Sequence, residues 1–288
     1  EMRDNGVKPN VVSFSAAISA CAKGKQWQEV MQLLEEMRQS GVEPNVVSYS
    51  AAMSAFEKSG QWQRSLYLFD EMRSSSIKPN IISFGAAISA CEKGLQWEKA
   101  LQLLDEMRLC GVQPDVMSLN ACMRTCVKSG QWEASLLLFD GMQQRGVIHD
   151  AISFSAAIQA CERGGQWELL LELVEEMRRR RMEPDSMSLS SAIRAYDRSE
   201  QSEKALQLLE EMRKRGSAPN TVSLTAAVRA CDKMGRWEQS LQLLDQIRYR
   251  GMKPDDSSLS AGISACIKGG QWKKAFELQH EMTQYKVG

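Results

Sequence analysis

Residues 11–45, VVSFSAAISACAKGKQWQEVMQLLEEMRQSGVEPN, recur with variation every 35 residues to the end of the chain. We number the positions of this repeat 1 to 35, so that Val11 occupies position 1. All seven tryptophans then fall at position 17 and all seven prolines at position 34. A fixed period of this length, without insertions, is the sequence signature of a repeat architecture.

The period divides the 288 residues into seven complete repeats and two partial ones. Residues 1–10 match positions 26–35 of a preceding repeat, so we expect the chain to begin inside a helix of a longer array. Complete repeats are predicted at 11–45, 46–80, 81–115, 116–150, 151–185, 186–220 and 221–255, with a final incomplete one at 256–288. We expect them to form one continuous superhelical domain.

Each repeat carries two helical patterns. Positions 4, 7, 8 and 11 are apolar or small, as in Phe14, Ala17, Ile18 and Cys21, and this spacing is the stripe of an amphipathic helix. Positions 17, 20, 21, 24 and 27 repeat the stripe, and a Gly–x–x–Pro segment ends it. One hairpin cannot bury its apolar face alone, whereas stacked hairpins can. The sequence therefore predicts an all-α solenoid of stacked helical hairpins.

Composition argues against several classes of function. The chain has 36 basic and 36 acidic residues, so it lacks the overall positive charge typical of many nucleic-acid-binding proteins. Only His149 and His280 are available for histidine-based catalysis or a histidine-rich metal site. No apolar run is long enough for a membrane helix, and no phosphate-binding loop, G-x-S-x-G or deaminase-type zinc motif is present. We expect no catalysis, cofactor or metal within this segment.

Repeats that read V-V-S-[FY]-S-A-A, then K-x-G-x-W, L-x-x-M-R and G-V-x-P-[ND] resemble pentatricopeptide repeats. The resemblance covers the whole chain and rests on Met at position 27, Pro at 34 and Asn or Asp at 35 as well as on the period. Trp at position 17 and Cys at 11 are peculiar to this sequence, and Ser202 replaces one Trp. The resemblance implies a right-handed solenoid that binds single-stranded RNA, one nucleotide per repeat, in a plastid or mitochondrion.

Positions 2, 5, 9 and 13 lie opposite the core stripe at 100° per residue, and we expect them to line the groove. With position 35, position 5 forms the couples that the resemblance assigns to base reading. The couples are Ser15 with Asn45, Ser50 with Asn80, Gly85 with Asp115, Asn120 with Asp150, Ser155 with Asp185, Ser190 with Asn220, and Thr225 with Asp255.

Two interpretations of position 35 remain open. Asn or Asp directly before a helix is a good N-cap, and Ser at position 3 suits the first turn, so capping alone makes the two residues interchangeable. Readout makes them different, because an ionised Asp only accepts hydrogen bonds whereas Asn also donates them. Carried over couple by couple, the related family code gives 5′-AANUGAG-3′, with no preference at the third base because Gly85 has no side chain.

Position 2 is apolar in seven repeats. Neighbouring helices lie about 8–10 Å apart, whereas stacked bases rise only about 3.4 Å, so one base per repeat requires unstacked bases with side chains between them. The alternative is packing at the helix start. The residues are Val12, Val47, Ile82, Met117, Ile152, Met187 and Val222.

Position 13 is basic in all eight repeats, as phosphate contact requires, although a cation near a helix C-terminus is also favoured by about 0.3–1 kcal/mol. The residues are Lys23, Lys58, Lys93, Lys128, Arg163, Arg198, Lys233 and Lys268. Arginines at position 9 add to this basic row, and acids at position 12 lie beside it.

Cysteines recur at position 11, on the core stripe of the first helix. Parallel helices about 8–10 Å apart cannot bring such thiols to one zinc ion or to disulfide distance. We therefore expect small buried core thiols, and we expect the tryptophan column to be core as well. Two functions remain: a sequence-specific adaptor for single-stranded RNA, or a protein- or peptide-binding scaffold without RNA readout.

Overall fold

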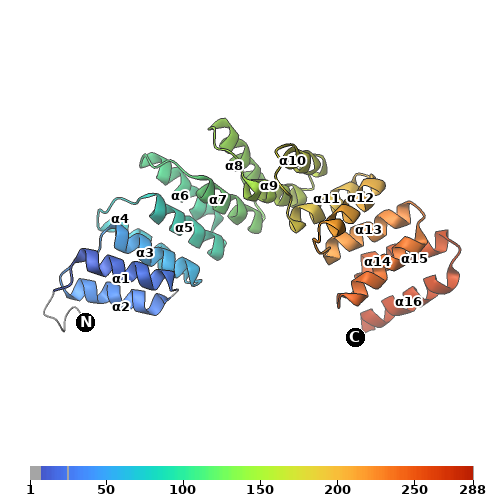
Figure 1. Ribbon diagram of the computed structural model, residues 1–288, viewed down its shortest axis with the longest axis horizontal. Coiled ribbons are helices and arrows are strands. Elements are labelled where there is room, and N and C mark those ends of the chain that lie inside the picture. Colours follow the sequence, from blue (N-terminus) through green and yellow to red (C-terminus); the bar gives the residue numbers. More distant parts are fainter. Residues whose placement is uncertain (1–7, 25, 288) are drawn as a thin grey trace. The chain divides into compact units, whose positions relative to one another are not determined.

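The computed structural model describes residues 8–24 and 26–287, the last three of them by backbone alone. Within these residues it contains sixteen helices and no strand (Figure 1). Each complete repeat contributes one helix that begins at position 1 and a second that begins at position 17. The predicted all-α hairpin solenoid is confirmed. Of the predicted tail of a preceding repeat, residues 1–7 lie outside the described residues.

The chain divides into two compact units, unit 1 from Glu1 to His149 and unit 2 from Asp150 to Gly288. Unit 1 holds α1 Val11–Lys23, α2 Trp27–Gln39, α3 Val46–Lys58, α4 Trp62–Ser74, α5 Ile81–Gly94, α6 Trp97–Leu109, α7 Val116–Lys128 and α8 Trp132–Gln144. Unit 2 holds α9 Ala151–Gly164, α10 Trp167–Arg179, α11 Ser186–Arg198, α12 Ser202–Lys214, α13 Thr221–Lys233, α14 Trp237–Tyr249, α15 Asp256–Lys268 and α16 Trp272–Val287. One continuous superhelical domain remains a prediction.

Local chemistry fixes both ends of each hairpin. Every odd-numbered helix starts at an Asn or Asp N-cap in extended conformation. The second helix of the first repeat, α2, ends at Gln39 at position 29, and the turn that follows is closed at position 31, where Gly41 has φ 69° and its N–H bonds to the carbonyl of Arg38. This left-handed residue closes a Schellman-type turn. Ser76 occupies the same position of the next repeat and has φ 58°. This left-handed conformation is less favourable for serine than for glycine, because serine has a β-carbon.

The core follows the predicted stripes. Phe14, Phe84 and Phe154, all at position 4, are buried, and Met37 and Met72 at position 27 are fully buried. Burying one such side chain contributes on the order of 1.5–3 kcal/mol. The core of each unit therefore runs along the axis of the stacked hairpins.

The two layers of helices differ in packing. Within each unit every odd-numbered helix packs on the next odd-numbered helix, whereas the even-numbered helices pack only on odd-numbered ones in the part of the chain that is described (Figure 1). The closer spacing places the odd-numbered layer on the inner side of the curve within each unit. Positions 2, 5, 9 and 13 belong to this layer.

The tryptophan column is not core, which corrects the prediction. Six tryptophans are half-buried, and Trp272 in the last repeat is 67% exposed. Three rings are seen to pack sideways on the following repeat: a β-carbon at Gly94 would lie 2.7 Å from the Trp62 ring, the Arg64 guanidinium lies 4.7 Å from the centre of the Trp27 ring, and the Lys274 ammonium lies 4.8 Å from that of Trp237. Trp at position 17 therefore joins neighbouring hairpins.

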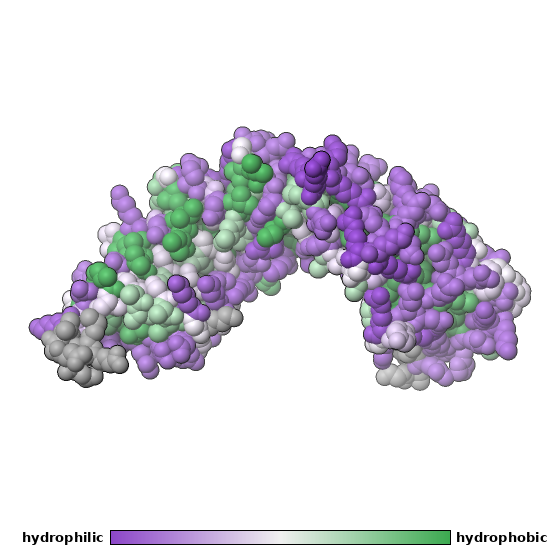
Figure 2. All heavy atoms as spheres, viewed as in Figure 1, coloured by the Kyte–Doolittle hydropathy of each residue, from purple (hydrophilic) through white to green (hydrophobic). Residues whose placement is uncertain are grey.

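Apolar surface is unevenly distributed on the face seen in Figure 2. Green surface lies over α4, α6 and α8 in unit 1, where Leu109 on α6 and Leu137 on α8 are exposed, whereas unit 2 is mostly hydrophilic in this view. Among the described helices none is both long and apolar enough to span a membrane.

Candidate nucleic-acid interface

Position 35 lies at the start of each odd-numbered helix, where its side chain caps the helix. The Asn45 Oδ1 accepts from the N–H groups of Val47 and Ser48, both at 3.0 Å, and the Asp185 Oδ1 accepts from the N–H of Ser188 at 2.7 Å. The same contact to position 3 recurs at the other N-caps, Asn10, Asn80, Asp115, Asp150, Asn220 and Asp255. The expected capping role is confirmed.

Position 5 lies beside this cap, so the predicted couples meet. The position-5 hydroxyl donates to the position-35 side chain at 3.4 Å from Ser15 to Asn45, 3.3 Å from Ser50 to Asn80, 3.1 Å from Ser155 to Asp185 and 3.4 Å from Thr225 to Asp255. Each contact joins two successive odd-numbered helices. Four of the seven predicted couples are thus directly bonded.

The other three couples differ. Ser190 donates to the carbonyl of Ser186 at 2.7 Å, and no bond to Asn220 is found within the described residues. Gly85 offers no side chain, and a β-carbon there would have the Ser118 Oγ at 3.9 Å as its nearest neighbour. Asn120 is buried in unit 1 and Asp150 caps α9 in unit 2, so their meeting remains a prediction.

This geometry separates capping from readout. Capping occupies Oδ1, an atom that Asn and Asp share, so capping cannot distinguish the two residues. The second terminal atom, an amide nitrogen in Asn45 and a carboxylate oxygen in Asp185, is the atom that differs. Capping and base reading are therefore compatible in one side chain, since the cap holds the discriminating atom in a fixed direction.

Sequence reasoning missed how deeply position 5 is placed. Ser15, Ser50, Ser190 and Thr225 are buried between successive odd-numbered helices, and Ser15 and Ser50 also donate to the carbonyl four residues earlier. The hydroxyls of Ser15, Ser50 and Thr225 also contact the position-35 side chain of the next repeat. The sequence signal for this burial was a Ser at position 5 surrounded by small and apolar residues.

The seven apolar residues at position 2 are all exposed, with exposed fractions from 43% at Val222 to 72% at Met117. Packing at the helix start therefore leaves much of each side chain uncovered. Position 2 is the second residue after the N-cap at position 35. These side chains therefore lie at the same end of each odd-numbered helix as the position-35 side chain.

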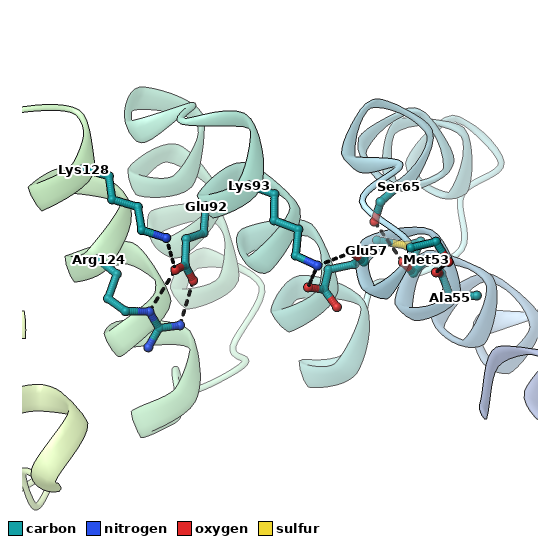
Figure 3. A network of polar contacts seen from close by, with 9 residues as sticks. Met53, Ala55, Glu57, Ser65, Glu92, Lys93, Arg124 and Lys128 are labelled. Carbon is teal, nitrogen blue, oxygen red and sulfur yellow. Dashed lines mark hydrogen bonds and ion pairs between the residues drawn. The ribbon is translucent and has the colours of Figure 1, made fainter. Parts of the chain in front are cut away.

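The position-13 cations are exposed, but acids neutralise part of the row. In Figure 3 the Lys93 Nζ lies 3.1 Å from Glu57, and Glu92 binds both Lys128 at 2.9 Å and Arg124 at 2.7 Å. Although burial raises the pKa of Glu92, hydrogen bonds from Arg124 and Lys128 outweigh it and hold that pKa below its ordinary value.

The same pairing recurs in unit 2. Lys233 lies 3.0 Å from Asp197 and Lys268 lies 2.8 Å from Asp232. Sequence reasoning placed these acids beside the row without pairing them. The sequence signal for these ion pairs was the spacing: a cation at position 13 follows the acid at position 12 of the preceding repeat by 36 residues.

Five of the six position-11 cysteines are buried as predicted, whereas Cys21 is only half-buried and Cys110, at another position of the repeat, is exposed. Cys91, Cys126 and Cys231 are buried and unpaired with one another, and burial raises the pKa of Cys91 to about 12 and those of Cys126 and Cys231 to about 11. In the described residues no group of three His, Cys, Asp or Glu side chains is placed to hold a metal ion.

Most of the chain matches models of pentatricopeptide repeat families. Residues 1–59 match the pentatricopeptide repeat domain, 44–93 the PPR repeat family, 131–260 the pentacotripeptide-repeat region of PRORP, and 82–112 and 263–287 the PPR repeat. Together these matches leave only residues 113–130, 261–262 and 288 uncovered. A search of curated protein sequences found no match.

Solved structures share the fold. The pentatricopeptide repeat protein PPR10 from maize is 21% identical over 98% of this chain, with a TM-score of 0.55, and the chain spans 45% of the length of that protein. The PPR domain of Arabidopsis thaliana protein-only RNase P 1, solved in complex with tRNA, is 14% identical, with a TM-score of 0.57 over 71% of this chain and 98% of that domain. The A. thaliana nuclear RNase P 2 is 16% identical, with a TM-score of 0.53 over 59% of this chain and 38% of that one. The family matches, which together cover most of the chain, show that it belongs to the pentatricopeptide repeat family.

Proposed function

We propose that this chain binds single-stranded RNA in a sequence-specific manner, with one nucleotide per repeat. The observation that carries the proposal is the couple of positions 5 and 35, which is bonded in four of the seven complete repeats and places a capped Asn or Asp beside the odd-numbered layer. The RNA-bound state of the RNase P 1 domain, which shares this fold, supports RNA as the ligand class.

The proposed mode of binding uses three rows of side chains. The position-35 atom and its position-5 partner read the base edge. The exposed apolar residues at position 2 separate successive bases, because the helix spacing of about 8–10 Å is wider than a base stack. Cations at position 13 contact the phosphates. Each correct base contributes on the order of 0.5–1.5 kcal/mol.

The couples predict the target 5′-AANUGAG-3′. We propose that the chain acts as a non-catalytic adaptor in the processing, stabilisation, editing or translation of organelle transcripts, in a plastid or mitochondrion. Membership of the pentatricopeptide repeat family supports this role.

The test is fluorescence anisotropy with 5′-AAAUGAG-3′ and the scrambled 5′-GAUAAGA-3′, which has the same composition. Five of the six specified bases are wrong in the scrambled RNA, so we expect it to bind more than about tenfold more weakly. Equal affinity for both, or no binding to either, would favour a protein- or peptide-binding scaffold in which Asn and Asp only cap helices.

A further inference from the structure

The ion pairs along the odd-numbered helices form a ladder between successive repeats. A carboxylate at position 12 contacts a cation at position 13 or 9 of the next repeat in all five cases where the acid is present. The acids and their partners are Glu57 with Lys93, Glu92 with Arg124 and Lys128, Glu162 with Arg194, Asp197 with Arg229 and Lys233, and Asp232 with Lys268.

The ladder divides the position-13 row in the same way in both units. The cations of the first two repeats make no ion pair within the described residues: these are Lys23 and Lys58 in unit 1 and Arg163 and Arg198 in unit 2. The cations of the last two repeats are all paired: these are Lys93 and Lys128 in unit 1 and Lys233 and Lys268 in unit 2.

Local sequence explains which cations are unpaired. Ala22 occupies position 12 in the repeat before Lys58, so no carboxylate is present there. Before Arg198 the acid is present, but Glu162 binds Arg194 at 2.6 Å and the hydroxyl of Ser191 instead.

The carboxylates are well placed to compete with a phosphate. Asp197 is 2% exposed at its side chain, and Glu57, Glu92, Glu162 and Asp232 are 14–19% exposed, whereas the cations they bind project further into solvent. A partly buried charge that loses its partner is strongly disfavoured. A phosphate that takes Lys128 therefore removes one of the two cations that offset the Glu92 charge.

We infer that the position-12 carboxylates compete with RNA phosphates for the position-13 cations. The RNA backbone is then anchored at the first two repeats of each unit, by Lys23 and Lys58 and by Arg163 and Arg198. Over the last two repeats of each unit, RNA is held by base reading and position-2 contacts with little phosphate contribution. The inference rests on the proposed function and specifies which of its cations act.

The experiment measures the salt dependence of binding to 5′-AAAUGAG-3′ and to a randomised 20-nucleotide RNA. For single strands the logarithm of the binding constant falls with the logarithm of salt concentration by about 0.7 per phosphate contact. One contact therefore changes the ratio of Kd at 200 mM to Kd at 50 mM salt by about 2.6-fold, and two contacts change it by about 7-fold.

Removing a carboxylate should free its cations. Glu57→Gln releases Lys93 and Glu92→Gln releases Lys128, and each is expected to raise this Kd ratio by about 2.6-fold. Glu35→Gln is the matched control, because Glu35 is exposed on α2 and carries the same charge change without a cation partner among the described residues. It should leave the ratio unchanged.

Three reciprocal variants test the distribution of contacts. Lys58→Ala should lower the Kd ratio by about 2.6-fold, whereas Lys128→Ala should leave it unchanged. Ala22→Glu introduces the missing acid opposite Lys58 and should reproduce the effect of Lys58→Ala. Thermal unfolding of each variant reports separately on folding.

The outcomes distinguish the inference from the proposed function. If wild-type protein binds RNA but Lys58→Ala and Lys128→Ala lower the ratio equally, or if Glu92→Gln behaves as Glu35→Gln does, the inference is overturned while RNA binding stands. If wild-type protein binds neither RNA at 50 mM salt, both are overturned.

Discussion

Replacing Asp185 by Asn separates helix capping from base reading at one repeat. Asp185 uses Oδ1 to cap α11, through the N–H of Ser188 at 2.7 Å, and its Oδ2 accepts from the Ser155 hydroxyl at 3.1 Å. An Asn side chain keeps the capping oxygen. Its amide nitrogen takes the place of Oδ2 and donates to Ser155, whose hydroxyl can also accept.

The structure therefore predicts a change in recognition without a change in stability. Because the cap is retained, Asp185→Asn should alter the free energy of unfolding by only a few tenths of a kcal/mol, whereas Asp185→Ala loses the cap and should lower it by about 0.5–2 kcal/mol. Exchange of one acceptor for a donor should move the preference at the fifth base from G towards A by about 0.5–1.5 kcal/mol, or about 2- to 13-fold in affinity.

The assay compares 5′-AAAUGAG-3′ with 5′-AAAUAAG-3′ by fluorescence anisotropy, alongside urea denaturation of both variants. Wild-type protein should prefer the first RNA and Asp185→Asn the second. If Asp185→Asn binds both RNAs as wild type does while only its unfolding curve changes, position 35 is a cap and nothing more.

Three further predictions concern the scaffold and its surface. Ile82→Ala should weaken RNA binding by about 1–2 kcal/mol with little change in the thermal midpoint, because this side chain is already 56% exposed without RNA; an unchanged Kd would remove position 2 from the interface. Gly94→Ala should lower the free energy of unfolding in urea by about 1–3 kcal/mol, since its β-carbon would meet the Trp62 ring at 2.7 Å. Gly141→Ala, where nothing lies within 4 Å, should raise it by about 0.5–1 kcal/mol; equal effects of the two would contradict the described packing. Because folded Cys91 keeps its proton to about pH 12 while the unfolded chain releases it near 9.0, the free energy of unfolding should fall from pH 9 to 12, and less steeply in Cys91→Ala; the same slope in both would show that this thiol is not buried.

Much of the fold could be predicted because the period repeats every local signal eight times. The N-cap at Asn45, the left-handed turn at Gly41 and the stripe through Phe14 are each set by residues within one or two helical turns. Local chemistry of this kind is readable from sequence alone. The bonded couples were also within reach, since their 30-residue separation is constant.

Contacts that depend on the sideways distance between hairpins could not be predicted in the same way. Trp62 is a large apolar residue of the kind expected in a core, but its ring packs on Gly94 of the next repeat, and this depends on how α4 is placed against α5. The Glu92 pair with Lys128 joins residues 36 apart on neighbouring helices. Helical periodicity within one repeat contains no information about such a contact.

A base-by-base scan of 5′-AAAUGAG-3′ tests the central claim most directly, with each position replaced in turn by the other three bases and the Kd of wild-type protein measured. The account predicts that substitutions weaken binding at six positions and that the third is indifferent, because Gly85 presents no side chain beside Asp115. Selectivity at the third base equal to that of its neighbours, or uniform affinity across the whole scan, would contradict it.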